Sequence, residues 1–116
     1  IHSYILVTAE VAMKNARAAE SEVIAGRYRG PLHGIPYALK DNIETAGIPT
    51  TGNSRLLIDH VPSADAPLVT KLKNAGGVLL GKTALREFAK GTRHDDLPCP
   101  NPLNPWYRSH EFAGGS

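Results

Sequence analysis

The run from Gly76 to Thr83, GGVLLGKT, fits the phosphate-loop pattern GxxxxGK[ST] at every position. In such a loop, backbone N–H groups curl around a phosphate between a strand and a helix. Here a helical pattern precedes the motif, and the apolar residues VLL favour a buried, extended backbone. We therefore interpret the first two glycines as a helix stop, VLL as a strand and Gly81 as a turn. Lys82 then lies at the surface or behind the groups that touch a substrate, and a P-loop nucleotide-binding module is kept as an alternative.

Lys40 is the second residue that could take part in chemistry, because it follows the apolar run IPYAL and precedes the turn DNIETAG. In a strand, alternation places Lys40 on the face of Pro36 and Ala38, with Asp41 on the opposite face. A lysine at a strand end usually extends its ammonium into water. A lysine kept dry by apolar neighbours instead has a lowered pKa and can act as a base. We expect Asp41 to bind backbone groups of the following turn rather than Lys40.

We expect His33 and Cys99 to have structural rather than catalytic roles. His33 lies among turn residues in PLHG, which favours structure over general-base chemistry. Cys99 lies between two prolines, where no positive or helix-start environment would activate its thiol, so we expect it to be inert. No metal-ligand spacing joins the remaining histidines, which are His2, His60, His94 and His110. We therefore expect no bound metal.

Two groups of residues leave two interpretations open. Thr50, Thr51 and Ser54 in TTGNS either line a substrate pocket near the lysine or form a turn. For Trp106 and Tyr107 we expect packing of the C-terminal loop onto the core, with a position at a pocket rim as the alternative.

Three long segments resemble the N-terminal part of the amidase signature family: GPLHGIPYALKDNIETAGIPTTGNS, SADAPLVTKLKNAGGVLLGKTALREFAKGT and NPLNPWYRSHEFAGGS. The resemblance covers Tyr4 to Ser116. It implies hydrolysis of carboxamides by a serine–serine–lysine triad, without a metal or an organic cofactor. By position it implies that Lys40 is the base, that Ser116 is the bridging serine, and that the nucleophilic serine lies in a later GGS segment.

The resemblance further implies a proton path from the nucleophile through Ser116 to a neutral Lys40. It also implies a strained cis peptide between Gly115 and Ser116, held by surrounding structure. We interpret Gly114 and Gly115 as substrate-binding, since glycines allow a close approach of the backbone. Because the nucleophile would lie beyond Ser116, we expect the chain as written to be inactive by itself.

The elements that position these residues alternate between strand and helix patterns. Residues 4–8, YILVT, predict a strand, and residues 9–25 predict a helix that Gly26 ends. IPYAL predicts a second strand, which is entered through a proline. On the first helix, the stripe expected to face the protein core consists of Ala12, Ala16, Ala19 and Val23.

Asp65 is expected to cap a second helix over residues 66–75, followed by the strand VLL. Its apolar face would consist of Leu68, Val69 and Leu72. Thr83 is expected to cap a short helix ALREFAK, and residues 91–116 read as an extended, proline-containing loop. This order predicts an α/β fold with a mixed, partly parallel sheet flanked by helices. We expect residues 1–116 to be the N-terminal part of a single amidase domain, truncated at its C-terminal end.

Composition limits the classes of partner. The formal net charge is +2 without runs of like charge, which favours neither nucleic acid nor a membrane surface as partner. The resemblance implies an amidase that acts on a small-molecule amide. We expect it to be cytoplasmic, and a homodimer is left open. A glutamyl-tRNA amidotransferase A subunit, from the same family, would add a larger complex and tRNA. A noncatalytic α/β binding module is an alternative of another class.

Overall fold

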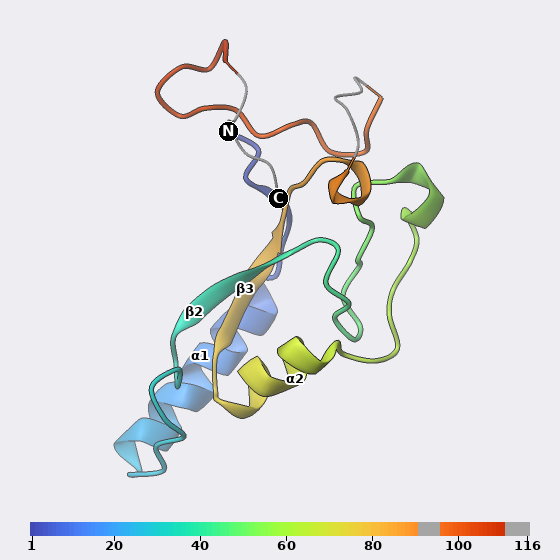
Figure 1. Ribbon diagram of the computed structural model, residues 1–116. Helices are drawn as coiled ribbons and strands as arrows, with labels where there is room; N and C mark the ends of the chain where they lie inside the picture. Colours follow the sequence, from blue (N-terminus) through green and yellow to red (C-terminus); the bar gives the residue numbers. More distant parts are fainter. Residues whose placement is uncertain (91–95, 111–116) are drawn as a thin grey trace.

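The computed structural model describes residues 1–90 and 96–110 (Figure 1). The order of elements along the chain is β1 (Tyr4–Val7), α1 (Ala9–Ile24), β2 (Pro36–Lys40), the 3₁₀ helix η1 (Arg55–Leu57), α2 (Pro67–Asn74), β3 (Val78–Thr83) and the 3₁₀ helix η2 (Glu87–Ala89). The predicted strands, the long first helix and the second helix are thus confirmed. Gly26 ends the first helical segment with φ +72°, as expected.

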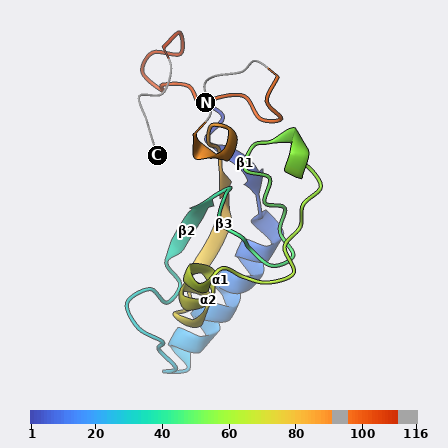
Figure 2. The same ribbon diagram turned by 45° about the vertical axis from the view of Figure 1, so that its right-hand side comes forward.

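The three strands form one sheet in the order β1-β3-β2, so the last strand is central. β3 runs antiparallel to β1 and parallel to β2, and Figure 2 shows the sheet from a second side. The predicted α/β fold with a mixed, partly parallel sheet is confirmed. The pairing of β2 with β3 shifts register between Tyr37 and Ala38, because Leu80 has no partner on β2.

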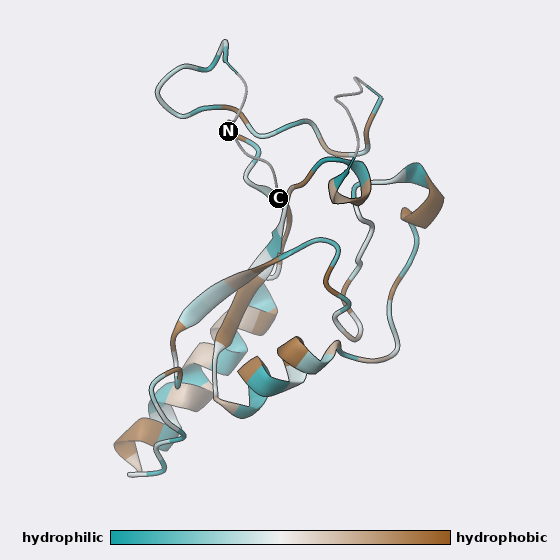
Figure 3. Ribbon diagram, viewed as in Figure 1, coloured by the Kyte–Doolittle hydropathy of each residue, from teal (hydrophilic) through white to brown (hydrophobic). Residues whose placement is uncertain are grey.

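The hydrophobic core lies where α2 covers the inner residues of β2 and β3. Leu39, Val69 and Leu79 are buried together, and Tyr37 and Leu72 pack against them. Figure 3 shows the apolar character of β3. Because both neighbours of β3 are strands, its residues are buried from more sides than those of β2.

The buried stripe of α1 is shorter than predicted. Ala12 and Ala19 are buried and Ala16 is half-buried, but Val23 is 47 % exposed. At this end of the helix Glu22 turns inward instead, because its carboxylate binds Arg29 and the buried His33. In the last turn of α1, Glu22 rather than Val23 therefore faces the protein.

The start of α2 also differs from the prediction. Ala66 occupies the N-cap position and no side chain caps the helix, so Asp65 is not the cap. Its carboxylate instead accepts a hydrogen bond from the Ala46 N–H at 2.7 Å and binds Lys73 Nζ at 2.6 Å. On the predicted apolar face Val69 is buried, whereas Leu68 is exposed. Asp65 thus joins α2 to the loop after β2.

β3 continues through the two positions where a turn and a helix cap were predicted. Gly81 is a strand residue paired with Val7, and Thr83 is the last residue of the strand. A Cβ atom on Gly81 would lie 2.2 Å from the Leu6 carbonyl oxygen, so glycine is needed for close approach rather than for a turn. The segment ALREFAK forms only η2, because Phe88 and its neighbour have positive φ values of +49° and +62°.

Residues 96–110 confirm the predicted loop for the part of 91–116 that the structure describes. The loop is joined to the body by Asn53, whose side chain hydrogen-bonds both the N–H and the C=O of Cys99. Trp106 is 89 % exposed and Tyr107 is exposed as well, so the predicted packing of this pair onto the core is wrong. No helix in the described residues is long and apolar enough to cross a membrane.

Candidate active site

Lys40 ends β2 beside Thr83 of the parallel strand β3, and its side chain is half-buried. Alternation along β2 buries Leu39 and leaves Pro36 and Ala38 exposed. Lys40 shares the face of those two residues, as predicted, and is half-buried there. The larger apolar side chains of β2, Tyr37 and Leu39, point to the opposite face of the sheet and pack in the core.

Lys82, expected at the surface or behind a site, is fully buried with 0 % exposure. Its ammonium donates hydrogen bonds to the Ile43 carbonyl oxygen at 2.8 Å and to Thr50 Oγ1 at 2.7 Å. It also lies 3.3 Å from Asp41 Oδ1. Burial lowers the pKa of Lys82, and the nearby Asp41 carboxylate opposes that shift by favouring the charged form. The surface interpretation is therefore wrong.

Asp41 binds the following turn, as predicted. Its Oδ2 accepts hydrogen bonds from the Thr51 N–H at 2.9 Å and from Thr51 Oγ1 at 2.7 Å. The pair that Asp41 forms with Lys82 was not predicted. The sequence offered only a weak signal: Lys82 follows the apolar run VLL after one glycine, and a fully buried lysine is normally paired.

The glycine-rich motif has no phosphate-binding conformation. Val78 to Thr83 form the central strand, so the backbone between the glycines and the lysine is extended and part of the sheet. It does not curl around an anion. The ammonium of Lys82 is held by Asp41, Ile43 and Thr50 inside the protein. This geometry argues against the nucleotide-binding alternative, as the sequence context did.

Thr50, Thr51 and Ser54 are buried and bind protein groups. The first two hydrogen-bond Lys82 and Asp41, and Ser54 Oγ accepts from the Leu56 N–H at the start of η1. Of the two interpretations left open, the structural one is supported.

The expected structural role of His33 is supported by its surroundings. The His33 ring is buried, and its Nδ1 accepts a hydrogen bond from the Arg29 N–H at 3.2 Å. Its Nε2 lies 3.0 Å from Glu22 Oε2. Burial raises the pKa of the Cys99 thiol, and Asp41 adds to that effect, which fits an inert cysteine. No metal-binding cluster of His, Cys, Asp and Glu occurs in residues 1–90 and 96–110.

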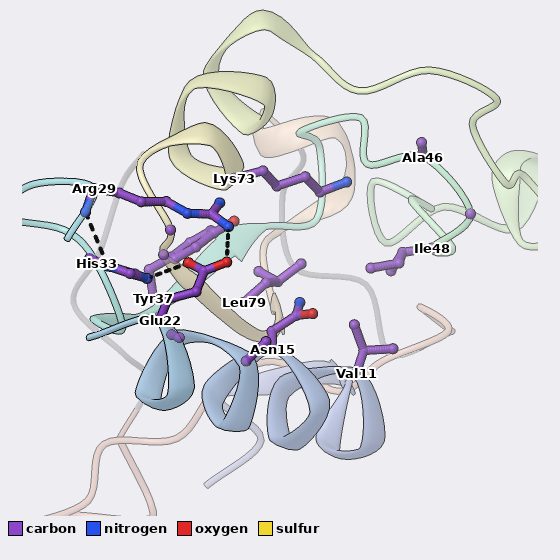
Figure 4. A pocket seen from close by; sticks show the side chains of 15 residues that line it. Val11, Asn15, Glu22, Arg29, His33, Tyr37, Ala46, Ile48, Lys73 and Leu79 are labelled. Carbon is purple, nitrogen blue, oxygen red and sulfur yellow. Dashed lines mark hydrogen bonds and ion pairs between the residues drawn. The ribbon is translucent and has the colours of Figure 1, made fainter. Parts of the chain in front are cut away.

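A cavity of about 500 Å³ lies between α1 and α2 (Figure 4). Strand alternation places its lining residue Tyr37 on the face of the sheet opposite Lys40. Tyr37 and Leu79 line its floor, and Glu22 joins Arg29 and His33 at one end. Lys40 and Lys82 do not line it. The cavity is therefore separate from the predicted catalytic residue.

The remaining predicted site residues, Gly114, Gly115 and Ser116, lie outside the described residues, as does His94. The cis peptide that the resemblance implied falls on the same segment. Of the predicted catalytic pair, the structure thus places Lys40 alone.

Comparison of the sequence with known proteins identifies the family of this chain. The family model described as Amidase matches residues 1–116, and the chain belongs to this family. The chain is 44% identical over 116 residues to the A subunit of the glutamyl-tRNA(Gln) amidotransferase of Carboxydothermus hydrogenoformans, covering 100% of this chain and 24% of that protein. The chain thus spans about a quarter of the length of that curated relative.

Solved structures agree with the family. The native peptide amidase from Stenotrophomonas maltophilia matches with a TM-score of 0.72 and 44% identity, covering 83% of this chain and 19% of that one. An amidase family protein from Bacillus anthracis matches with a TM-score of 0.75 and 30% identity, covering 91% of this chain and 22% of that one. The sheet and helices described above are therefore similar to part of larger amidase structures.

Proposed function

We propose that the polypeptide carrying this chain hydrolyses carboxamide C–N bonds through a serine–serine–lysine triad. Lys40 is its base and Ser116 its bridging serine, and the nucleophilic serine lies in a GGS segment beyond residue 116. The observation that supports this most is the family match over residues 1–116, combined with the position of Lys40 at the end of a strand beside the central strand. A chain without the nucleophile would be inactive by itself.

The proposed chemistry needs Lys40 without a proton. At its ordinary pKa near 10.4, a lysine is neutral in only about one molecule in 2,500 at pH 7, a handicap of roughly 4.6 kcal/mol. Apolar neighbours favour the neutral form of a lysine by desolvating its ammonium. The proposal therefore requires that Lys40 lie in dry surroundings in the active enzyme.

In the reaction, Lys40 Nζ accepts the proton of Ser116 Oγ while Ser116 Oγ accepts that of the nucleophilic serine. The nucleophile then bonds to the carbonyl carbon, and the amide nitrogen leaves with a proton returned along the same path. Water hydrolyses the resulting ester and restores the serine. Gly114 and Gly115 would allow the backbone to approach the substrate closely.

A second candidate is the A subunit of a glutamyl-tRNA amidotransferase. Its support is that two relatives, from Carboxydothermus hydrogenoformans and, at 42% identity over 116 residues, from Nostoc punctiforme, both carry that name. In this case the polypeptide would work within a larger complex, and its partners would include tRNA. The serine and lysine chemistry would be the same.

Ammonia release tests these functions. The whole polypeptide is incubated with a panel of simple amides and with glutamine, alone and together with amidotransferase partner proteins and tRNA. Turnover by the polypeptide alone supports a free-standing amidase, and turnover of glutamine only with the partners supports the amidotransferase. Loss of ammonia release in folded Lys40→Ala and Ser116→Ala variants supports the triad. Full turnover by both variants would contradict it.

A further inference from the structure

A buried cluster joins β3 to the loop that follows Lys40. The ammonium of Lys82 contacts Asp41, the first residue of that loop, and also Ile43 and Thr50 further along it. Asp41 in turn holds Thr51 through two hydrogen bonds. Lys82 and Asp41 have 0 % and 1 % exposed side chains, so these contacts are shielded from water.

The same loop holds the backbone on the C-terminal side of Lys40. The Lys40 carbonyl oxygen accepts a hydrogen bond from the Ile43 N–H at 3.0 Å, and the Asp41 N–H donates to the Thr83 carbonyl oxygen at 3.1 Å. The Asp41 carbonyl oxygen accepts from the Gly52 N–H at 2.9 Å. Ile43 therefore accepts from Lys82 and donates to Lys40, which links the two lysines through one residue.

We propose that Lys82 and Asp41 are positioning residues for Lys40, and that their buried ion pair fixes the end of β2 from which the Lys40 side chain leaves. The inference rests on the proposed function, because it assigns the pair a purpose in placing a base. Neither residue touches the substrate in this account.

Physical chemistry explains why an ion pair would be used here. An apolar pair of similar volume often stabilises a fold as well as a buried ion pair does, so stability alone does not call for charges at this place. Charged hydrogen bonds, in contrast, fix direction. Lys82 donates hydrogen bonds to Ile43 and Thr50 of one loop and forms an ion pair with Asp41 at its start. A base must lie within hydrogen-bond reach of its hydroxyl, and a displacement of about 1 Å can lower the rate on the order of 100-fold.

The test compares kcat and KM for ammonia release by the whole polypeptide, with any partners it requires. The variants are Lys82→Met, Asp41→Asn and the double variant. We expect kcat to fall about 10- to 100-fold in each, with KM changed less than about 3-fold, because chemistry is disturbed and binding is not. We expect the double variant to be no slower than the slower single variant, since both act through one contact.

Val69→Ala is the matched control for lost stability. Val69 is fully buried in α2, and it belongs to the core cluster rather than to the charged one. We expect this variant to unfold at a lower temperature and to keep its kcat. If Lys82→Met does not fold, Thr51→Val replaces it and keeps both charges. It removes the hydroxyl's hydrogen bond to Asp41 and the one that the hydroxyl accepts from the Asn53 N–H. We expect a smaller fall in kcat for Thr51→Val.

The outcomes separate this inference from the proposed function. Unchanged kcat in the folded variants, or losses that multiply in the double variant, would overturn the positioning role while Lys40→Ala still abolishes turnover. A fall in kcat for Val69→Ala equal to that of Lys82→Met would overturn it too. If the wild-type protein releases no ammonia, or Lys40→Ala is as fast as wild type, the proposed function fails and the positioning role fails with it.

Discussion

Lys82 Nζ lies 3.3 Å from Asp41 Oδ1, with the two side chains 0 % and 1 % exposed. This pair joins the central strand β3 to the residue that follows Lys40. Lys82 is the cation paired with the Asp41 carboxylate, whose hydrogen bonds within the described residues come from the neutral N–H and hydroxyl of Thr51. If Lys40 is the base, the pair couples the stability of the sheet to the geometry of that base.

Lys82→Met tests that coupling by leaving the Asp41 carboxylate buried without its cation. We expect the free energy of unfolding to fall by about 3–5 kcal/mol, measured by urea denaturation. The control is Lys73→Met, which removes a lysine from the more exposed pair with Asp65. That change is expected to cost less than about 1 kcal/mol. Equal losses for the two variants would show that the Lys82 pair is not buried as described.

Gly81→Ala tests the close approach of β1 to β3. The added Cβ would lie 2.2 Å from the Leu6 carbonyl oxygen, so β1 must move away. We expect a loss of about 3 kcal/mol or more in the free energy of unfolding. Gly26→Ala is the comparison, because Gly26 has φ +72° and open space around it. Its expected cost is about 1–2 kcal/mol from backbone strain alone. A smaller loss for Gly81→Ala than for Gly26→Ala would contradict the strand pairing.

Cys99 is expected to react slowly with iodoacetamide. Burial raises the pKa of its thiol above the ordinary value of 9.0, so the reactive thiolate is scarce at neutral pH. Alkylation of the Cys99 peptide, followed by mass spectrometry across a pH series, should therefore show a midpoint above 9.0. Unfolding in urea should move the midpoint down to the ordinary value. A native midpoint below it would indicate an activated thiol.

We expect the contacts of Glu22 to contribute stability that is lost in acid. The hydrogen bond from Arg29 lowers the pKa of Glu22 below its ordinary 4.5 against the effect of burial, and His33 adds to this lowering. The contribution is therefore complete above pH 4.5 and is lost as the pH falls through the lower folded-state pKa. We expect Glu22→Gln to have a lower Tm than wild type at pH 7. Scanning calorimetry should show this difference shrinking below pH 4.5, and a constant difference would contradict the assignment.

The sequence was sufficient to predict the elements whose patterns are local. The β-prone run YILVT, the alanine-rich helix and the segment IPYAL all formed as expected. The failures have non-local causes. Asp65 was expected to cap its own helix but binds Ala46 and Lys73, and Gly81 was read as a turn although it accommodates the Leu6 carbonyl of a distant strand.

The same contrast between local patterns and non-local contacts applies to the candidate site. Alternation along β2 placed Lys40 and Asp41 on opposite faces, and Asp41 was correctly expected to bind the next turn. The burial of Lys82 and its pair with Asp41 were not predicted, and the register shift at Leu80 contributes to this. Simple alternation from the buried Leu79 would place Lys82 on the opposite face, whereas the shift aligns it with the buried Leu39. Such an irregularity depends on the neighbouring strand and leaves little trace in the local pattern.

The most direct test of the central claim is the kcat for ammonia release by Lys40→Ala beside a matched lysine variant. Lys14→Ala serves as the match, because Lys14 is exposed on α1. If Lys40 is the base, Lys40→Ala should lower kcat by about 100- to 10,000-fold while Lys14→Ala stays near wild type. A folded Lys40→Ala enzyme with a kcat within a few-fold of wild type would contradict the account.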